Sequence, residues 1–239
     1  MGEQSSRQGY GRQGTAVCQP GCVIELHRDG DLLLLDLGEG DHRFNPDTIA
    51  RIEHLLDEVE GSPEPRALVT VATGKIWHNG LDLDWLGAHP DQMGEFLGSV
   101  QRLLARLLVL PVPTVAAVQG HAFAAGAMFA LAHDTRLMRA DRGFFCLPEI
   151  DIKIPFTSGM AALIQARLTP GVAHEAMTTG RRYGGEDAAA LGIADGAYGE
   201  DEIGPAALEL ARSRAGKDAT TLGAIKKVAD GATYAALTG

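Results

Sequence analysis

The chain has 239 residues, 45% of them hydrophobic, and a formal net charge of −10. Its length and composition fit one large domain with a sizeable core, and the lack of a Lys/Arg-rich block argues against nucleic acid as a partner. No apolar run is long enough to span a bilayer, and the polar N-terminus lacks the apolar segment of a secretory signal.

The first 20 residues are polar and rich in Gly and Gln, and we expect them to form a flexible tail. Cys18 and Cys22 have a C-x3-C spacing here, but no second Cys/His pair lies nearby to complete a zinc site. We therefore expect no metal. With Cys146 the chain has only three cysteines, which fits a reducing compartment and predicts a cytoplasmic protein.

The next segments predict a hairpin, a helix and a buried strand. Residues 23–27 and 32–37 read as strands on either side of an Arg-Asp-Gly-Asp turn. Residues 48–60 carry apolar side chains at helical spacing after an Asn-Pro-Asp start. Residues 67–72 form a continuous apolar run, which is typical of a strand buried on both faces.

The middle of the chain continues this alternation. The sequence predicts a helix over residues 97–110, strands over 114–118 and 135–138, and between these strands a Gly/Ala-rich turn over 120–126 that leads into a short apolar helix. Strands that alternate with helices imply βαβ crossovers, with functional groups at the carboxyl ends of the strands.

From residue 157 onward the pattern is helical. The predicted helices cover residues 161–166, 171–178, 186–190, 204–214 and 222–237. The chain is therefore expected to be an α/β protein, with a core over residues 21–190 that holds the functional site and a C-terminal helical region over residues 191–239.

A loop near residue 149 places one acid in an apolar frame. Glu149 lies among Phe145, Leu147, Pro148 and Ile150. An apolar environment raises the pKa of a carboxyl group and suits it to moving protons. The Gly/Ala turn before it allows close approach to the backbone, and a helix that starts there directs free N–H groups at an anion. Together they indicate an anion hole facing a single acid–base residue.

Three motifs in order carry a family resemblance: GKIWHNGLDLDWL over residues 74–86, GHAFAAGAMF over 120–129, and LPEI over 147–150. With these, the chain resembles the crotonase superfamily, also called the enoyl-CoA hydratase/isomerase family. The resemblance implies a crotonase-like spiral of ββα turns with a C-terminal trimerisation region. It also implies an acyl-CoA thioester substrate, no cofactor beyond the coenzyme A of that substrate, and a homotrimer or dimer of trimers.

The resemblance also assigns site residues. Two backbone N–H groups, those of Leu81 and Ala125, match the family's oxyanion hole for the thioester carbonyl. Two amides fixed at that oxygen would stabilise its charge as it develops. The positions expected to contact substrate are Lys75, His78, Gly80, Gly126, Met128 and Phe156.

The acids indicate the reaction. Hydratases of the family use two glutamates; here Met128 stands at the first position and Glu149 at the second. Isomerases of the family keep only the later acid, which removes a proton from C2 of a 3-enoyl thioester and returns it at C4. The chain therefore looks most like a Δ3,Δ2-enoyl-CoA isomerase.

Several alternatives stay open. Another acyl-CoA reaction of this fold, such as weak hydration, hydrolysis or decarboxylation, and a non-catalytic acyl-CoA-binding role are compatible with the motifs. Asp84, His121 and Asp151 lie close enough in sequence to these motifs to take part, although capping, packing and solvation are their ordinary roles. Lys226 and Lys227 lie on the last predicted helix, which in the family can cover the coenzyme.

Overall fold

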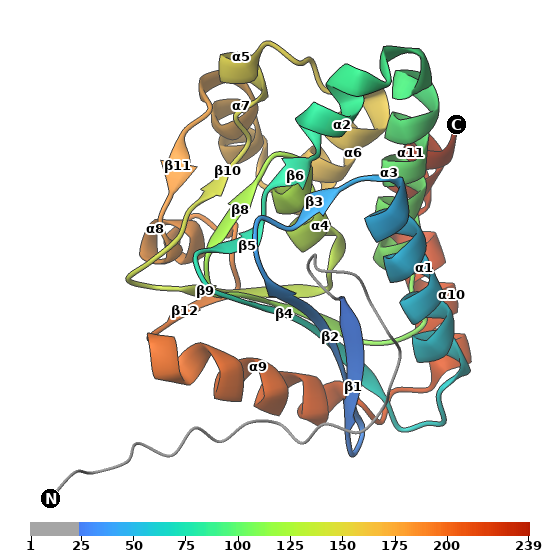
Figure 1. Ribbon diagram of the computed structural model, residues 1–239. Helices are drawn as coiled ribbons and strands as arrows, with labels where there is room; N and C mark the ends of the chain where they lie inside the picture. The colour runs from blue at the N-terminus through green and yellow to red at the C-terminus, as the bar shows by residue number, and fades with distance from the viewer. Residues whose placement is uncertain (1–23) are drawn as a thin grey trace, which may run out of the picture.

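The computed structural model describes residues 24–239, so the predicted tail, Cys18 and Cys22 lie outside the described residues. A six-stranded sheet lies at the centre (Figure 1). In order across the sheet its strands are β1 (Glu25–Asp29), β2 (Leu32–Glu39), β4 (Ala67–Thr73), β7 (Thr114–Val118), β9 (Thr135–Arg139) and β12 (Gly196–Tyr198). β1 and β2 form the predicted antiparallel hairpin, and all other neighbours are parallel.

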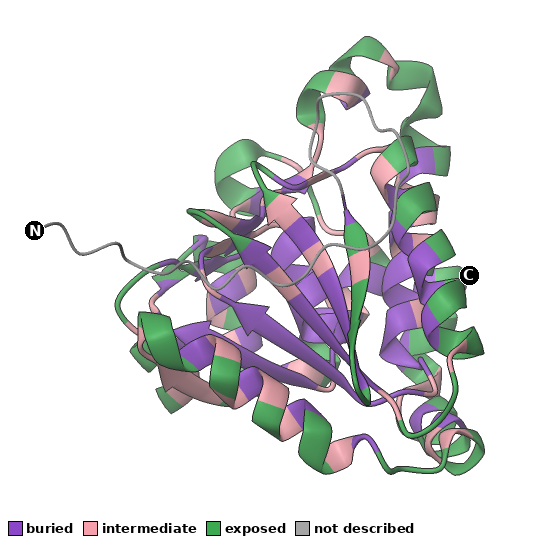
Figure 2. Ribbon diagram, turned by 60° about the horizontal axis from the view of Figure 1, so that its bottom comes forward, coloured by how far each residue is buried: buried purple, intermediate pink, exposed green. Residues whose placement is uncertain are grey.

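The central strands are buried on both faces, as the apolar runs predicted (Figure 2). Side chains alternate between two clusters because successive residues of a strand point to opposite faces. Leu33 and Leu35 of β2 belong to the main core, whereas Leu32 and Leu34 belong to a smaller cluster. Helix α9 (Glu200–Arg214) closes this smaller cluster from below the sheet (Figure 1).

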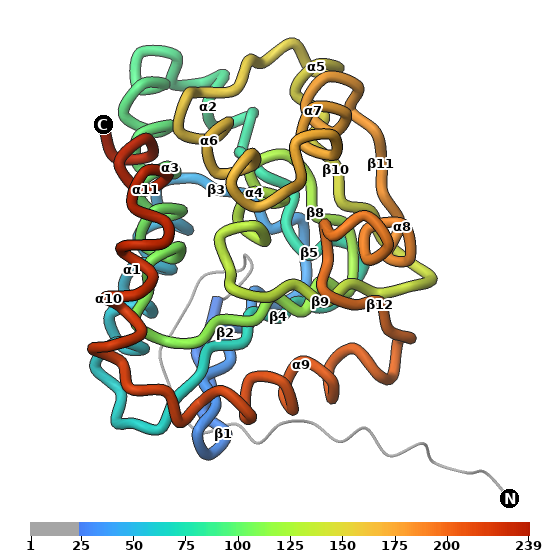
Figure 3. Tube along the Cα trace, turned by 180° about the vertical axis from the view of Figure 1, so that it is seen from behind, coloured from blue at the N-terminus to red at the C-terminus, as the bar shows by residue number. Residues whose placement is uncertain are grey.

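Helices from both ends of the chain pack together along one side. α1 (Pro46–Gly61) contacts α3 (Met93–Leu108), and α3 also contacts the C-terminal helix α11 (Gly231–Thr238), with α10 (Ala219–Ala229) below it (Figure 3). The prediction of one helix over residues 222–237 was wrong. The chain turns at Asp230, whose backbone (φ −106°, ψ 10°) ends α10 and begins α11.

Short strands that the sequence did not predict form two further sheets. One has the order β11 (Arg182–Tyr183), β10 (Phe145–Cys146), β8 (His121–Phe123) and β5 (Ile76–His78), and the other pairs β3 (Arg43–Phe44) with β6 (Gly80–Leu81). The predicted turn over residues 120–126 thus contains β8 and the start of α4 (Ala125–Ala132).

The remaining helices lie around these short strands. They are α2 (Leu83–Ala88), the 3-10 turn η1 (Pro90–Gln92), α5 (Glu149–Ile152), α6 (Ser158–Arg167), α7 (Pro170–Thr179) and α8 (Gly185–Ala190). Within residues 24–239 no helix is both long and apolar enough to cross a bilayer. The division of the chain at residue 190 stays a prediction, although α9 and α11 both pack directly on the core.

Candidate active site

Three parallel strands bring the three sequence motifs to one place. β8 pairs in parallel with β5 on one side and with β10 on the other. Neighbouring parallel strands end at the same edge of a sheet, so the segments that follow them start side by side. The segments after β5, β8 and β10 carry Leu81, Ala125 and Glu149.

The first two of these segments interlock through two glycines. A Cβ at Gly80, whose φ is +85°, would lie 3.1 Å from the backbone N of Ala125. A Cβ at Gly126 would lie 2.3 Å from the carbonyl oxygen of His78. Any larger residue at either position would push the segments apart, so these glycines set how close the Leu81 and Ala125 amides can come.

The N-terminus of α4 opens into this region. Its N-cap is Ala124, which makes no side-chain capping bond. The first N–H groups of a helix have no partner within the helix and carry the positive end of its dipole. Ala124 itself has φ 51° and ψ −127°, a conformation that L-residues rarely adopt, so the turn that presents Ala125 is strained.

Glu149 is the first residue of α5 and is only 6% exposed. Burial raises the pKa of its carboxyl group from 4.5 to about 7, and a hydrogen bond from the backbone opposes this shift. Its Oε2 atom has no hydrogen-bond partner among the described residues. A buried carboxylate oxygen without a partner costs free energy, and a bound ligand that donates to this oxygen would remove that cost.

A cavity of about 370 Å³ joins these features. Its polar lining residues are Arg43, Asn79, Asp84, Glu149 and Thr157. Its apolar and backbone lining comes from Leu81, Leu83, Leu97, Phe123, Ala124, Ala125, Met128, Pro148, Ile152, Ile154, Pro155, Phe156 and Met160. A concave, mainly apolar site with a few polar groups is suited to a small ligand with an apolar chain.

The structure brings together five of the nine residues assigned from the sequence. Leu81, Ala125, Met128, Glu149 and Phe156 all line the cavity.

The other four assigned residues lie outside that lining. Gly80 and Gly126 shape the two segments from behind the lining. His78 is buried beneath them at 2% exposure. Lys75 is exposed in the turn before β5, where its carbonyl accepts a hydrogen bond from the backbone N–H of His121.

The sequence leaves Asp84, His121 and Asp151 open as possible participants, and of these three only Asp84 lines the cavity. Its side chain is 94% exposed and pairs with Arg43 over 3.2 Å. Arg43 lines the cavity too and was missed, because it precedes the first motif and carries no pattern of its own. His121 lies between the rings of Phe123 and Phe144, and burial, followed by the charge of Lys75, lowers its pKa.

Asp151 lies on α5 but is exposed and does not line the cavity. It packs instead against Gly180, where a Cβ would lie 2.6 Å from the Asp151 Oδ2 atom. This contact joins the turn that carries Glu149 to the end of α7.

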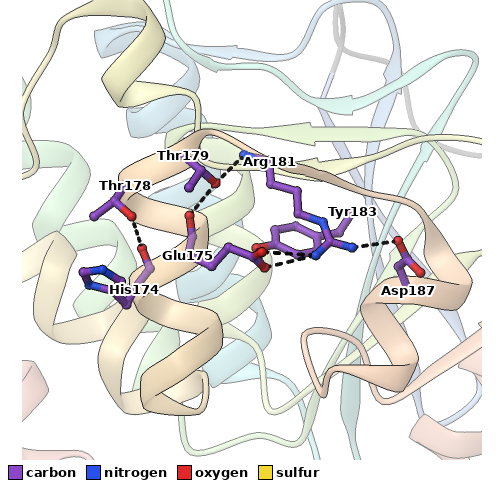
Figure 4. A network of polar contacts seen from close by, with 7 residues as sticks. All are labelled: His174, Glu175, Thr178, Thr179, Arg181, Tyr183 and Asp187. Atoms are coloured by element: carbon purple, nitrogen blue, oxygen red, sulfur yellow. Dashed lines mark hydrogen bonds and ion pairs between the residues drawn. The ribbon is translucent and has the colours of Figure 1, made fainter.

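A polar network holds the outer edge of the same sheet (Figure 4). The Tyr183 hydroxyl donates to Glu175 Oε2 over 2.9 Å, and Arg181 bridges Glu175 and Asp187. Burial, with the Glu175 hydrogen bond second, raises the pKa of Tyr183 to about 12. Because β11 pairs with β10, the network holds the strand that leads to Glu149.

No group of three His, Cys, Asp or Glu side chains that could hold a metal ion occurs within residues 24–239.

Comparison with known proteins gives consistent matches. The family model described as Enoyl-CoA hydratase/isomerase matches residues 41–238. Enoyl-CoA delta isomerase 3 of Arabidopsis thaliana is 41% identical over 204 residues, which cover 82% of this chain and 86% of that protein. Enoyl-CoA delta isomerase 2, peroxisomal, of the same plant is 40% identical, with 76% of this chain and 80% of that protein covered.

A solved structure shares the fold. The probable enoyl-CoA hydratase EchA3 of Mycobacterium tuberculosis superposes with a TM-score of 0.83 at 24% identity, and the match covers 90% of this chain and 91% of that one. The expected crotonase-like fold is confirmed by this likeness.

Proposed function

The chain belongs to the enoyl-CoA hydratase/isomerase family, and we propose that it converts 3-enoyl-CoA thioesters to 2-enoyl-CoA thioesters. One observation carries the proposal: Glu149 is the one buried acid among the described residues that line the cavity. In the motif resemblance, Met128 takes the position of the other glutamate of a hydratase. The similarity to two plant enoyl-CoA delta isomerases supports the same reaction.

In this proposal the Leu81 and Ala125 amides bind the thioester carbonyl oxygen. Removal of a C2 proton creates a dienolate, whose negative charge gathers on that oxygen. These two fixed N–H donors, one in β6 and one at the N-terminus of α4, stabilise the charge more strongly than they stabilise the neutral ester, and this lowers the barrier. The close contact of Gly80 with Ala125 supports donors that are adjacent and rigid.

Glu149 acts as the proton shuttle. Its carboxylate takes the proton from C2, is neutral in the intermediate, and gives the proton back at C4. A pKa near 7 suits both steps, because neither protonation state is strongly favoured at neutral pH. Its Oε2 atom has no hydrogen-bond partner within residues 24–239 to give up when substrate enters.

In this proposal Met128 favours isomerisation over hydration. Syn-hydration needs a water held between two carboxylates, and a thioether cannot activate water. Met128 is 1% exposed and lies with Phe156 in the apolar lining, where it would exclude water from the dienolate. Weak hydration, hydrolysis and decarboxylation remain the alternative reactions, and acyl-CoA binding without catalysis is the alternative role.

The remaining expectations are part of the proposal. Lys75 would meet the phosphates of coenzyme A, and no other cofactor is expected.

We propose a trimer or dimer of trimers, supported by apolar side chains exposed on the C-terminal helices, Val228 at 86% among them. A stable monomer at micromolar concentration in sedimentation would contradict this. A cytoplasmic location stays a prediction, which cell fractionation can test, because two relatives are named peroxisomal.

The decisive experiment compares turnover of 3-hexenoyl-CoA by the wild type, Glu149→Gln and Asp151→Asn. Glu149→Gln keeps shape and hydrogen bonding but cannot carry the proton, so we expect turnover to fall at least about 10²-fold with little change in acyl-CoA affinity. Asp151→Asn is the matched control, because it removes the nearest exposed acid of α5. Near-normal activity in Glu149→Gln would refute the shuttle, and inactivity of the wild type on 3-enoyl and 2-enoyl esters would favour the binding role.

A further inference from the structure

His78 lies beneath both segments that present the proposed oxyanion donors. It is the last residue of β5, and its side chain is buried. In the sheet it pairs with Ala122 of β8, after an irregularity in register between Ile76 and His78. The segment that leads to Leu81 follows His78, and the segment that leads to Ala125 follows its partner Ala122.

The imidazole contacts the first segment directly. The backbone N–H of Gly80 donates a hydrogen bond to His78 Nδ1 over 3.1 Å. A backbone N–H can only donate, so Nδ1 accepts and the ring is neutral. Burial, with the charge of His42 second, lowers the pKa of His78 to about 3, and the ring remains an acceptor throughout the neutral range. Gly80 immediately precedes Leu81, so this bond fixes the peptide next to the donor.

The backbone of His78 contacts the second segment. A Cβ at Gly126 would lie 2.3 Å from the His78 carbonyl oxygen and 2.9 Å from the His78 Cβ. Gly126 immediately follows Ala125. One residue therefore touches the neighbour of each proposed donor.

Aromatic packing fixes the orientation of the ring. The Phe44 ring lies 4.0 Å from the imidazole, and the Phe129 ring lies 5.7 Å from it, between centroids. Phe44 pairs with Leu81 in the β3–β6 sheet, and Phe129 belongs to α4, which Ala125 begins. The imidazole is thus held by α4, which carries Ala125, and by β3, which pairs with the strand that carries Leu81.

We infer that His78 is a positioning residue that sets the distance and direction of the Leu81 amide relative to the Ala125 amide. The inference rests on the proposed oxyanion role of these amides. A preorganised donor is effective only at its correct position, and removing one such donor typically costs about 10²–10³-fold in kcat. Losing the bond that positions a donor should cost less, and we expect about 10-fold.

The test compares two substitutions of nearly equal shape. In His78→Asn the side-chain Oδ1 stands where Nδ1 stood and can accept from Gly80, whereas His78→Leu offers no acceptor. We expect His78→Leu to lower kcat on 3-hexenoyl-CoA about 10-fold with KM within about threefold, because the loss falls on the transition state. We expect His78→Asn to retain kcat within about threefold of the wild type.

A purely structural role predicts a different pattern. Both variants remove the same part of the ring, so both would then lose stability and activity together. Equal loss in the two variants, or full activity in His78→Leu, would overturn the inference. If His78→Leu does not fold, His78→Phe keeps ring volume between Phe44 and Phe129 without an acceptor at Nδ1, and the same loss of kcat is expected.

A second measurement separates this inference from the proposed reaction. The carbonyl stretch of bound hexanoyl-CoA, a saturated thioester that cannot isomerise, reports hydrogen bonding to the carbonyl oxygen. We expect the wild type and His78→Asn to lower its frequency and His78→Leu to lower it less. An unchanged shift in His78→Leu would contradict the positioning role whether or not the wild type is an isomerase.

Discussion

Glu149 and Met128 line the same cavity, one with a carboxylate and the other with a thioether, and both are almost completely buried. Among the described residues that line the cavity, Glu149 is the buried acid, and the other acid, Asp84, is 94% exposed. Burial therefore dominates the pKa of Glu149, and the charge of a neighbouring carboxylate does not contribute.

The pH dependence of activity should report this pKa. In the proposed mechanism Glu149 is the base of the free enzyme and must be ionised to begin, and burial raises its pKa to about 7. We expect kcat/KM to be level above about pH 8 and to fall tenfold per pH unit well below pH 7. A pH series on 3-hexenoyl-CoA measures this. An acid limb with a midpoint near pH 4.5 would show that burial does not perturb Glu149 in solution.

The same shift should make Glu149 destabilising at high pH. The folded-state pKa, about 7, lies above the ordinary value of 4.5, so the folded state binds more protons between these values and loses stability as pH rises through them. The full effect corresponds to about 3 kcal/mol. Glu149→Gln should therefore be more stable than the wild type at pH 8 and similar to it below pH 4.5.

Urea unfolding at both pH values measures this difference. Asp151→Asn, on the same helix but exposed, is the control for replacing an acid of this helix by its amide. A stability difference between Glu149→Gln and the wild type that is the same at both pH values would contradict the assignment to ionisation.

Adding the missing carboxylate should add hydration. In Met128→Glu a second buried acid would line the cavity with Glu149, and a water could be held between the two. We expect hydration of 2-hexenoyl-CoA to rise at least about tenfold over Met128→Gln, which has the same shape without the acid, since an added acid–base group typically contributes about 10²–10⁴-fold. Loss of the enoyl-thioester absorbance measures it. A wild type that hydrates as fast as it isomerises would contradict the proposed role of Met128.

Lys226 should matter for stability, because its side chain is buried against polar partners in the core. Its Nζ atom lies 2.7 Å from Asp134 Oδ2 and donates to the carbonyl of Val112 over 2.9 Å, which joins α10 to the core. Of the two lysines on this helix only Lys227 is exposed.

Lys226→Met would leave the Asp134 carboxylate without its cation. Removing one partner of a buried pair typically costs 3–5 kcal/mol, but Asp134 still accepts from the N–H of Thr114 and is partly exposed, so we expect about 2 kcal/mol. Urea unfolding measures the loss. The double variant Lys226→Met with Asp134→Asn should recover part of the lost free energy of unfolding. If the losses of the two single variants simply add in the double variant, the two side chains do not interact.

The sequence by itself determined the buried elements and the chemical groups. The largely apolar runs of β4 and β7 predicted strands buried on both faces, because neither shows an alternation of polar and apolar side chains. The three motifs indicated the family, and Met128 with Glu149 indicated one acid where hydratases have two. These are local properties, readable from residue type and spacing.

Only the tertiary structure decided how these groups meet. β5, β8 and β10 are two or three residues long and carry no periodic signal, yet their parallel pairing places Leu81, Ala125 and Glu149 together. The sequence predicted that His78 contacts substrate. In the structure its side chain is buried and accepts a hydrogen bond from Gly80. Such short strands exist because distant segments supply their hydrogen bonds, and that information is not local to any of them.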